Sequence, residues 1–188
     1  MSLVIGFLNL LKRIMASNDP AVNWVKVLVL MGSALPVIVF IANATNSRDW
    51  RWYKTDFEDR PGRIIIYHDG GQIELQPGQP GFNELAEAIR ASLAQGVDQQ
   101  SNTGLSDYSR QEAYTRYTTV EAFFAKPVKL HAWFYTGNPT QMLFPITGRH
   151  SDRPIVFLGQ DGEYRVNAPF LKTKEPIMQV LRESGYLN

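Results

Sequence analysis

Three histidines have the widest chemical range of any side chains in this sequence. His68 stands beside Asp69 after an apolar run, His131 lies in an alternating segment, and His150 precedes Asp152 by two residues. Histidine nitrogens and carboxylate oxygens ligate divalent metals, so a fold that gathered these side chains could build a metal site. No two histidines have a helical three- or four-residue separation. We therefore predict solvated turn residues and one histidine on a sheet face, and no metal ligand.

Other catalytic and cofactor patterns give no positive sign. Residues 70–71 and 78–81 are the glycine-rich places, and neither is followed by the lysine and hydroxyl of a phosphate-binding loop. The sequence contains neither G-x-S-x-G nor H-E-x-x-H, and it has no cysteine. We predict that the protein is not an enzyme and binds no cofactor.

The C-terminal third is locally basic. Two interpretations are possible: a bound anion among these cations or, as we prefer, an ordinary solvated face. The cations are Arg149, Arg153, Arg165, Lys172 and Lys174.

An apolar stretch at residues 21–44 must position everything that follows it. As a helix it would be about 36 Å long, enough to cross a hydrocarbon core of about 30 Å. We predict one retained transmembrane helix. Two alternatives remain open: a buried helix of a soluble protein, and a signal peptide cleaved after the small-x-small run at residues 42–44, with basic residues upstream.

Aromatic and basic residues flank this stretch, as is typical of the membrane–water interface. A docking surface for a partner subunit is the alternative, and base stacking on nucleic acid is disfavoured. The predicted membrane-interface residues are Trp24, Trp50, Arg51, Trp52, Tyr53 and Lys54.

The charge balance argues against a nucleic-acid partner. The formal net charge is +1, of which residues 1–44 supply +2, so the remaining chain carries about −1. Nucleic-acid binders usually show a basic surplus. Cations are nearly balanced across the apolar stretch, but a short basic N-terminus is typical of a signal anchor, which favours an extracytoplasmic domain in a cell membrane.

The remaining segments predict an α+β fold with a mainly antiparallel sheet and two or three helices packed on one face. The predicted organisation is an apolar, amphipathic interfacial segment at 1–20, the transmembrane helix at 21–44, an aromatic and basic linker at 45–60, and a soluble domain at 61–188. Predicted strands are 64–67, 73–75, 118–125, 128–135, 142–146 (an edge or bulged strand because of Pro145), 155–158 and 164–166. Predicted helices are 82–95, 109–117 (opened by a capping box at residues 109–112) and one from Glu175, with a mobile loop at 97–107.

These features favour a non-catalytic, single-pass membrane protein whose domain mediates protein interaction. It could be an accessory subunit of a larger membrane complex, with the lipid bilayer and other membrane subunits as partners. The alternative is a membrane-anchored sensor or ligand-binding domain, in which residues 97–107 would gate a pocket. The sequence does not identify a small-molecule ligand.

Overall fold

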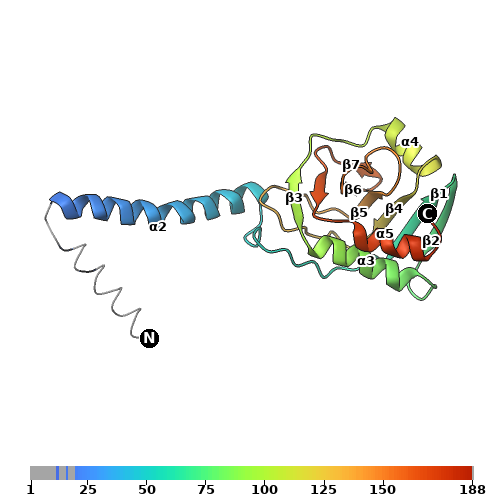
Figure 1. The fold of residues 1–188 in the computed structure, drawn as a ribbon, viewed down its shortest axis with the longest axis horizontal. Coiled ribbons are helices and arrows are strands. Elements are labelled where there is room, and N and C mark those ends of the chain that lie inside the picture. The colour runs from blue at the N-terminus through green and yellow to red at the C-terminus, as the bar shows by residue number, and fades with distance from the viewer. Residues whose placement is uncertain (1–11, 13–15, 17–19, 188) are drawn as a thin grey trace.

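A long N-terminal helix projects from a sheet-based domain in the computed structural model, which describes residues 12, 16 and 20–187 (Figure 1). Most of the predicted interfacial segment at 1–20 lies outside the described residues. The helix, α2 (Pro20–Ser47), has 28 residues, so it is about 42 Å long. It continues through Pro36 and ends three residues beyond the predicted apolar stretch.

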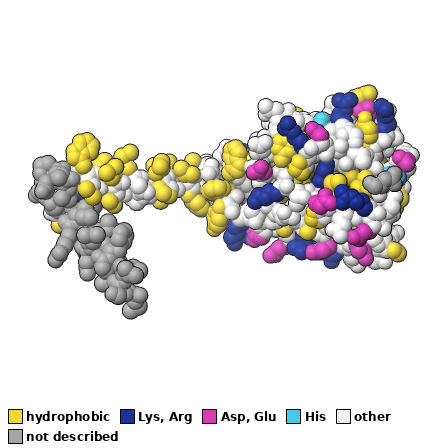
Figure 2. Space-filling model, viewed as in Figure 1, with side chains coloured by type: hydrophobic (Ala, Val, Ile, Leu, Met, Phe, Trp, Pro, Cys, Tyr) yellow, Lys and Arg dark blue, Asp and Glu magenta, His cyan; other side chains and the backbone are white. Residues whose placement is uncertain are grey.

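The helix α2 is long and apolar enough to cross a membrane. None of its most apolar window within Asn23–Ser47 is buried against the rest of the chain. Figure 2 shows hydrophobic side chains along α2, whereas acidic and basic side chains are spread over the domain. By length and composition the helix fits a membrane span, and a signal sequence would have the same properties.

The domain is built on a six-stranded antiparallel sheet with the order β2-β1-β4-β5-β6-β7. Its strands are β1 (Arg63–His68), β2 (Gly71–Leu75), β4 (Thr119–Phe123), β5 (Gln141–Pro145), β6 (Phe157–Gln160) and β7 (Glu163–Tyr164). A second pair joins β3 (Val97–Gln100) to β8 (Pro169–Leu171). The α+β prediction is confirmed.

Helices cover both faces of the sheet, where the sequence predicted one covered face. The helices α3 (Phe82–Ala94) and α5 (Glu175–Glu183) pack together over the larger apolar core. The helix α4 (Asp107–Thr115) lies on the opposite face, where Tyr114 packs against a smaller apolar cluster that includes Leu143 and Phe157. Alternate residues of a strand face opposite sides, so β5 contributes to both cores.

Two hairpins and two helices lie where local signals place them. Residues 69–71 turn β1 into β2, and residues 161–162 turn β6 into β7; Asp69 and Asp161 have positive φ. Glycine ends α3 at Gly96, and Pro176 stands in the first turn of α5. Local turn and capping residues were sufficient to predict these elements.

The predicted strand at 128–135 is wrong. Its side chains do alternate between buried and more exposed, but among residues 20–187 the segment pairs with no strand. It instead folds back on itself, because Thr136 Oγ1 donates to the carbonyl of Leu130 and the Val128 N–H donates to the carbonyl of Pro139. The alternating pattern of these side chains indicates which of them are buried, and does not indicate pairing with a neighbouring strand.

Three further predictions need correction. Residues 97–100 are not a loop but form the strand β3. The helix α4 begins at Asp107 and not at the predicted capping box, because the residue that caps it is Ser106. The side chain of Ser106 accepts a hydrogen bond from the Ser109 N–H at 3.2 Å. The strand β5 is an interior strand. It tolerates Pro145 because β6 pairs only with residues 141–143, so no ladder donor is needed at that end.

Candidate functional site at the junction of α2 and the domain

The last turn of α2 is embedded in the domain. Ala44 and Ser47 are buried, and Asn46 Nδ2 donates to the carbonyl of Trp133 at 3.1 Å. Just past the helix, Lys129 Nζ donates to the carbonyl of Arg48, also at 3.1 Å. The non-strand segment 128–136 therefore binds the helix end to the domain.

A buried aspartate–histidine pair reinforces this junction. His131 Nδ1 donates to Asp49 Oδ2 at 2.5 Å, and the Arg51 N–H donates to Asp49 Oδ1 at 2.9 Å. Burial alone would raise the pKa of Asp49, but these hydrogen bonds and the nearby charges of His131 and Lys129 hold that pKa below its ordinary value. The carboxylate thus stays ionised at neutral pH.

His131 meets the geometric condition for a catalytic histidine only in part. It lies in a cleft and touches an acid, but its other nitrogen, Nε2, is 3.7 Å from Asp56 Oδ1. Both ring nitrogens therefore face carboxylates. The cleft is lined by charged residues and one phenylalanine, with no hydroxyl or thiol: Asp49, Arg51, Asp56, Phe57, Glu58, Asp59, Lys129 and His131. This arrangement suits a structural role, in which Asp49 and His131 hold the end of α2 against the domain.

Aromatic rings gather around α2 where it enters the domain. Phe40 has Trp50, Trp52 and Tyr53 at ring-centroid distances of 5.9, 6.2 and 6.0 Å. Trp50 is 66% exposed and Tyr53 58% exposed. We call these four residues the aromatic collar. Trp24, which is 75% exposed, lies 16 residues before Phe40, or about 24 Å along the helix.

The remaining predicted interface residues, Arg51 and Lys54, lie in different environments. Arg51 pairs with Asp56 at 2.5 Å, whereas the side chain of Lys54 is exposed. Sequence reasoning missed Trp133, which is 48% exposed and whose carbonyl anchors Asn46. It was assigned to a strand, so its place beside α2 could not be inferred.

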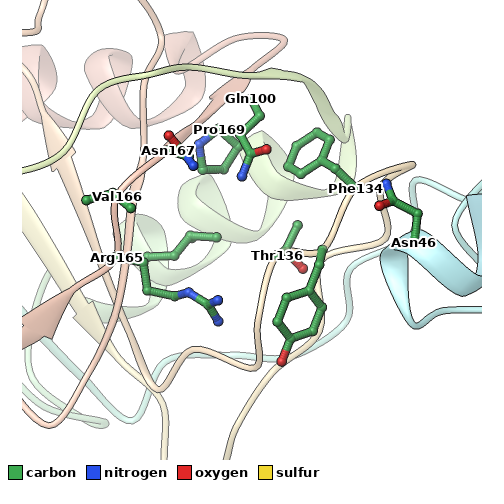
Figure 3. Close-up of a pocket in the computed structure, with 10 residues that line it drawn as sticks. Asn46, Gln100, Phe134, Thr136, Arg165, Val166, Asn167 and Pro169 are labelled. Atoms are coloured by element: carbon green, nitrogen blue, oxygen red, sulfur yellow. The ribbon is translucent and has the colours of Figure 1, made fainter.

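A cavity of about 490 Å³ opens beside the same junction (Figure 3). Figure 3 shows Arg165 and Val166 on one side and Phe134, Thr136 and Asn46 on the other. The lining contains amides, hydroxyls, one guanidinium and apolar side chains, and no carboxylate. Its residues are Asn46, Gln100, Phe134, Tyr135, Thr136, Leu158, Arg165, Val166, Asn167 and Pro169.

Two arginines stack on one ring at this cavity. The guanidinium carbons of Arg48 and Arg165 lie 4.8 and 5.0 Å from the ring centroid of Tyr135. Within residues 20–187, neither guanidinium forms an ion pair with a carboxylate. Gly137 makes room for this arrangement, because a Cβ there would come within 2.2 Å of the Arg165 guanidinium.

The basic C-terminal third is not one solvated face. Arg149 pairs with Glu112 at 2.9 Å, and Arg153 stacks on the ring of Phe170 at 5.6 Å. Lys174 is buried and donates to the carbonyls of Pro145, Ser151 and Arg153, and burial lowers the pKa of its ammonium to about 8. Only Arg165 of this set lines the cavity at the junction.

The other two histidines lie apart from His131. His68 contacts Thr118 at 2.9 Å and Asp69 at 3.4 Å. The ring of His150 packs edge-on against Phe157, and burial together with the charge of Arg149 lowers its pKa. In the described part of the chain, no group of three metal-ligating side chains is placed to hold an ion.

A second buried carboxylate lies inside the sheet. Glu121 is 3% exposed and accepts from Tyr67 at 3.0 Å, from Tyr114 at 3.2 Å and from Tyr164. Burial, with the nearby charge of Glu121, raises the pKa of all three phenols, that of Tyr114 to about 12. Sequence reasoning missed this group because its members are 7 to 54 residues from Glu121. Glu121 is buried and its three tyrosine partners are half-buried, so the group contributes to the packing of the sheet.

Comparison with protein-family models, with curated proteins and with solved structures gives no match. The function must therefore be argued from the residues of the junction themselves.

Proposed function

We propose that the chain is a non-catalytic, single-pass membrane protein whose domain mediates protein interaction as an accessory subunit of a larger membrane complex. One observation carries this proposal: the final turn of α2 is packed into the domain, where Ala44 and Ser47 are buried and Asn46 donates to the carbonyl of Trp133. A fixed helix end sets the height and orientation of the domain relative to the bilayer. A binding domain that only needs to stay near a membrane requires no such coupling.

Several features support a retained anchor. The exposed apolar side chains of α2 lie between Trp24 and the aromatic collar, and these aromatic ends are separated by roughly the thickness of a hydrocarbon core. The alternative cleavage position, after Ala44, lies inside the helix at a buried residue. Cleavage there would first require the junction to open.

The non-catalytic part of the proposal rests on the junction chemistry. The Nδ1 atom of His131 is engaged by Asp49, and Nε2 faces a second carboxylate, Asp56 Oδ1, at 3.7 Å, which is beyond hydrogen-bond distance. No side chain lining this cleft is a hydroxyl or thiol nucleophile.

The second candidate function, an anchored ligand-binding domain, is favoured by the cavity beside α2. A volume of about 490 Å³ is within the range of small-molecule sites. The segment expected to gate a pocket has another role here. Gln100 lines the cavity from β3, and the Ser101 N–H donates to the carbonyl of Ala168, so this part is a fixed wall.

Extraction of native membranes with mild detergent, followed by size separation, tests the subunit proposal. The wild-type chain should co-migrate with a large assembly. The double variant Asn46→Ala, His131→Gln should lose most of that co-migration, because it frees the domain from α2. Asn83→Ala, on the exposed start of α3, is the matched control and should behave as wild type.

Two outcomes would overturn the proposal. Migration of the wild-type chain as a lone protein with its micelle would contradict the subunit role. Release without detergent, with an N-terminus at Thr45, would contradict the anchor. The proposed extracytoplasmic placement is tested separately, by protease digestion of sealed membranes, which should remove the domain only from the outer side.

A further inference from the structure

We propose that the cavity at the α2 junction binds an organic phosphate, a phosphate ester with an apolar body, through Arg165 and Arg48. The first step is charge. The lining contains a guanidinium and no carboxylate, and Arg48 stacks on a lining ring, also without an acidic partner in the described chain. Two unneutralised cations beside one cavity favour an anion in it.

The second step is preorganisation. The ring of Tyr135 receives both guanidinium groups, at 4.8 and 5.0 Å from its centroid. Such stacking fixes the planar groups and leaves their N–H edges available. Guanidinium edges match the oxygens of a phosphate with paired hydrogen bonds, and less ordering is needed when the groups are already held.

The third step is the remaining lining. Amide donors are available from Gln100 and Asn167, and the hydroxyl of Tyr135 adds another polar group at the wall. Phe134 and Leu158 provide apolar walls, and the 72% exposed side chain of Val166 lies at the cavity. A ligand with both a phosphate and a hydrocarbon part would cover these groups together.

The fourth step is location. Asn46 lines the cavity and lies six residues beyond Phe40 of the aromatic collar, or about 9 Å along the axis. A polar headgroup layer extends about 5–7 Å beyond the hydrocarbon core of each leaflet. With Phe40 at the edge of the hydrocarbon core, Asn46 thus lies just beyond that layer, where soluble phosphate esters can enter and phospholipid headgroups border the cavity. The lipid source rests on the proposed anchoring, whereas the phosphate chemistry does not.

Binding to the full chain, purified in a non-ionic detergent, tests the proposal with two probes. Butyl phosphate, which has a phosphate and a hydrocarbon part, represents a soluble ester and is titrated calorimetrically. Phosphatidylglycerol in mixed micelles, with phosphatidylcholine as the neutral comparison, represents a headgroup, and native mass spectrometry counts the lipids retained. At least one of the two anionic probes should bind the wild-type chain.

Variants assign binding to the cavity. Arg165→Gln should weaken binding at least tenfold, Arg48→Gln somewhat less, and Arg165→Lys should fall between wild type and Arg165→Gln. Arg63→Gln is the matched control, because Arg63 also stacks on an aromatic ring but pairs with Glu74 on the neighbouring strand β2 and does not line the cavity. An unchanged thermal melting temperature confirms that each variant is folded.

The outcomes distinguish a soluble phosphate ester from a phospholipid headgroup as the source of the ligand. Binding of butyl phosphate that Arg165→Gln abolishes supports the site with a soluble ligand, even if the chain proves not to be anchored. Binding of phosphatidylglycerol alone supports a headgroup ligand. The proposal is overturned if neither probe binds, or if Arg165→Gln and Arg63→Gln bind as the wild type does.

Discussion

Glu121 and Asp49 are both buried carboxylates, and their surroundings differ in kind. Glu121 lies within the sheet and is satisfied by three neutral phenols, whereas Asp49 lies at the end of α2 and is satisfied by an imidazole and a backbone N–H, with a lysine nearby. The first group stabilises the interior of one domain. The second joins two parts of the molecule through charges, so its strength depends on pH and salt.

Removing Glu121 should have the largest effect. Glu121→Ala removes the buried carboxylate that accepts from three half-buried phenols, and should lower the free energy of unfolding of the domain by about 3 kcal/mol. Denaturant titration monitored by near-ultraviolet circular dichroism measures it. Glu74→Ala, on the exposed strand β2, is the control and should cost less than about 0.5 kcal/mol. A loss of under about 1 kcal/mol for Glu121→Ala would contradict the cluster's role.

Removing Asp49 should have a smaller and more local effect. Asp49→Ala should cost about 2 kcal/mol at the junction, because His131 loses its acceptor while buried. Hydrogen exchange of the amides in residues 128–136 should accelerate, while that of β1 and β4 stays slow. Asp56→Asn, at the exposed side of the same histidine, should change little. Uniform acceleration across the sheet would show that the two regions are not separable.

Removing one hydroxyl donor from the tyrosine group around Glu121 should lower the free energy of unfolding by about 1 kcal/mol. Tyr67→Phe removes one hydroxyl to Glu121 but keeps the ring stacked on Tyr114, at a centroid distance of 4.4 Å. Denaturant titration again provides the measurement, with the exposed Tyr53→Phe as the control. Equal stability of these two variants would contradict the prediction.

Acid should weaken the junction before the sheet. Because the pKa of Asp49 is lower in the folded state, the stability it contributes is present above its unfolded pKa of about 3.8 and is lost as pH falls through its folded pKa. The effect should be a fraction of that of Asp49→Ala. Exchange in residues 128–136, measured at decreasing pH and corrected for the intrinsic rate, should rise in the wild type and stay level in Asp49→Ala.

Alkali should act on the other region. The raised phenol pKa values mean that this stability is present below the unfolded tyrosine pKa of about 10 and is lost as pH rises above it. Tyrosinate absorbance should show the exposed phenols ionising first and Tyr114 only near pH 12. Ionisation of all tyrosines in one step near pH 10 would overturn the assignment.

The sequence predicted those elements that depend on neighbours along the chain. The hairpins follow from the turns at residues 69–71 and 161–162, and α3 follows from its apolar face and Gly96. The failures concern contacts between distant residues. Alternation at 128–135 indicates which side chains are buried, but pairing requires a partner strand, which this segment lacks.

Most of the candidate site could not be predicted from the sequence, for the same reason. Tyr135 and Arg165 are 30 residues apart, and Arg165 and Arg48 reach the ring of Tyr135 only through the fold. The aromatic and basic character of residues 48–54 was visible, and so was the cationic C-terminal third. Their convergence on one ring was not, since no periodicity encodes it.

The embedded end of α2 has a mechanical consequence. A continuous helix whose last turn is fixed to the domain behaves as a stiff shaft, so rotation of the helix about its axis turns the domain by the same angle. At 3.6 residues per turn, one residue inserted before Phe40 would turn the domain by about 100° around the helix axis, whereas seven would return it to within about 20°. The proposed assembly with a membrane partner should therefore vary with helical phase and not with helix length alone.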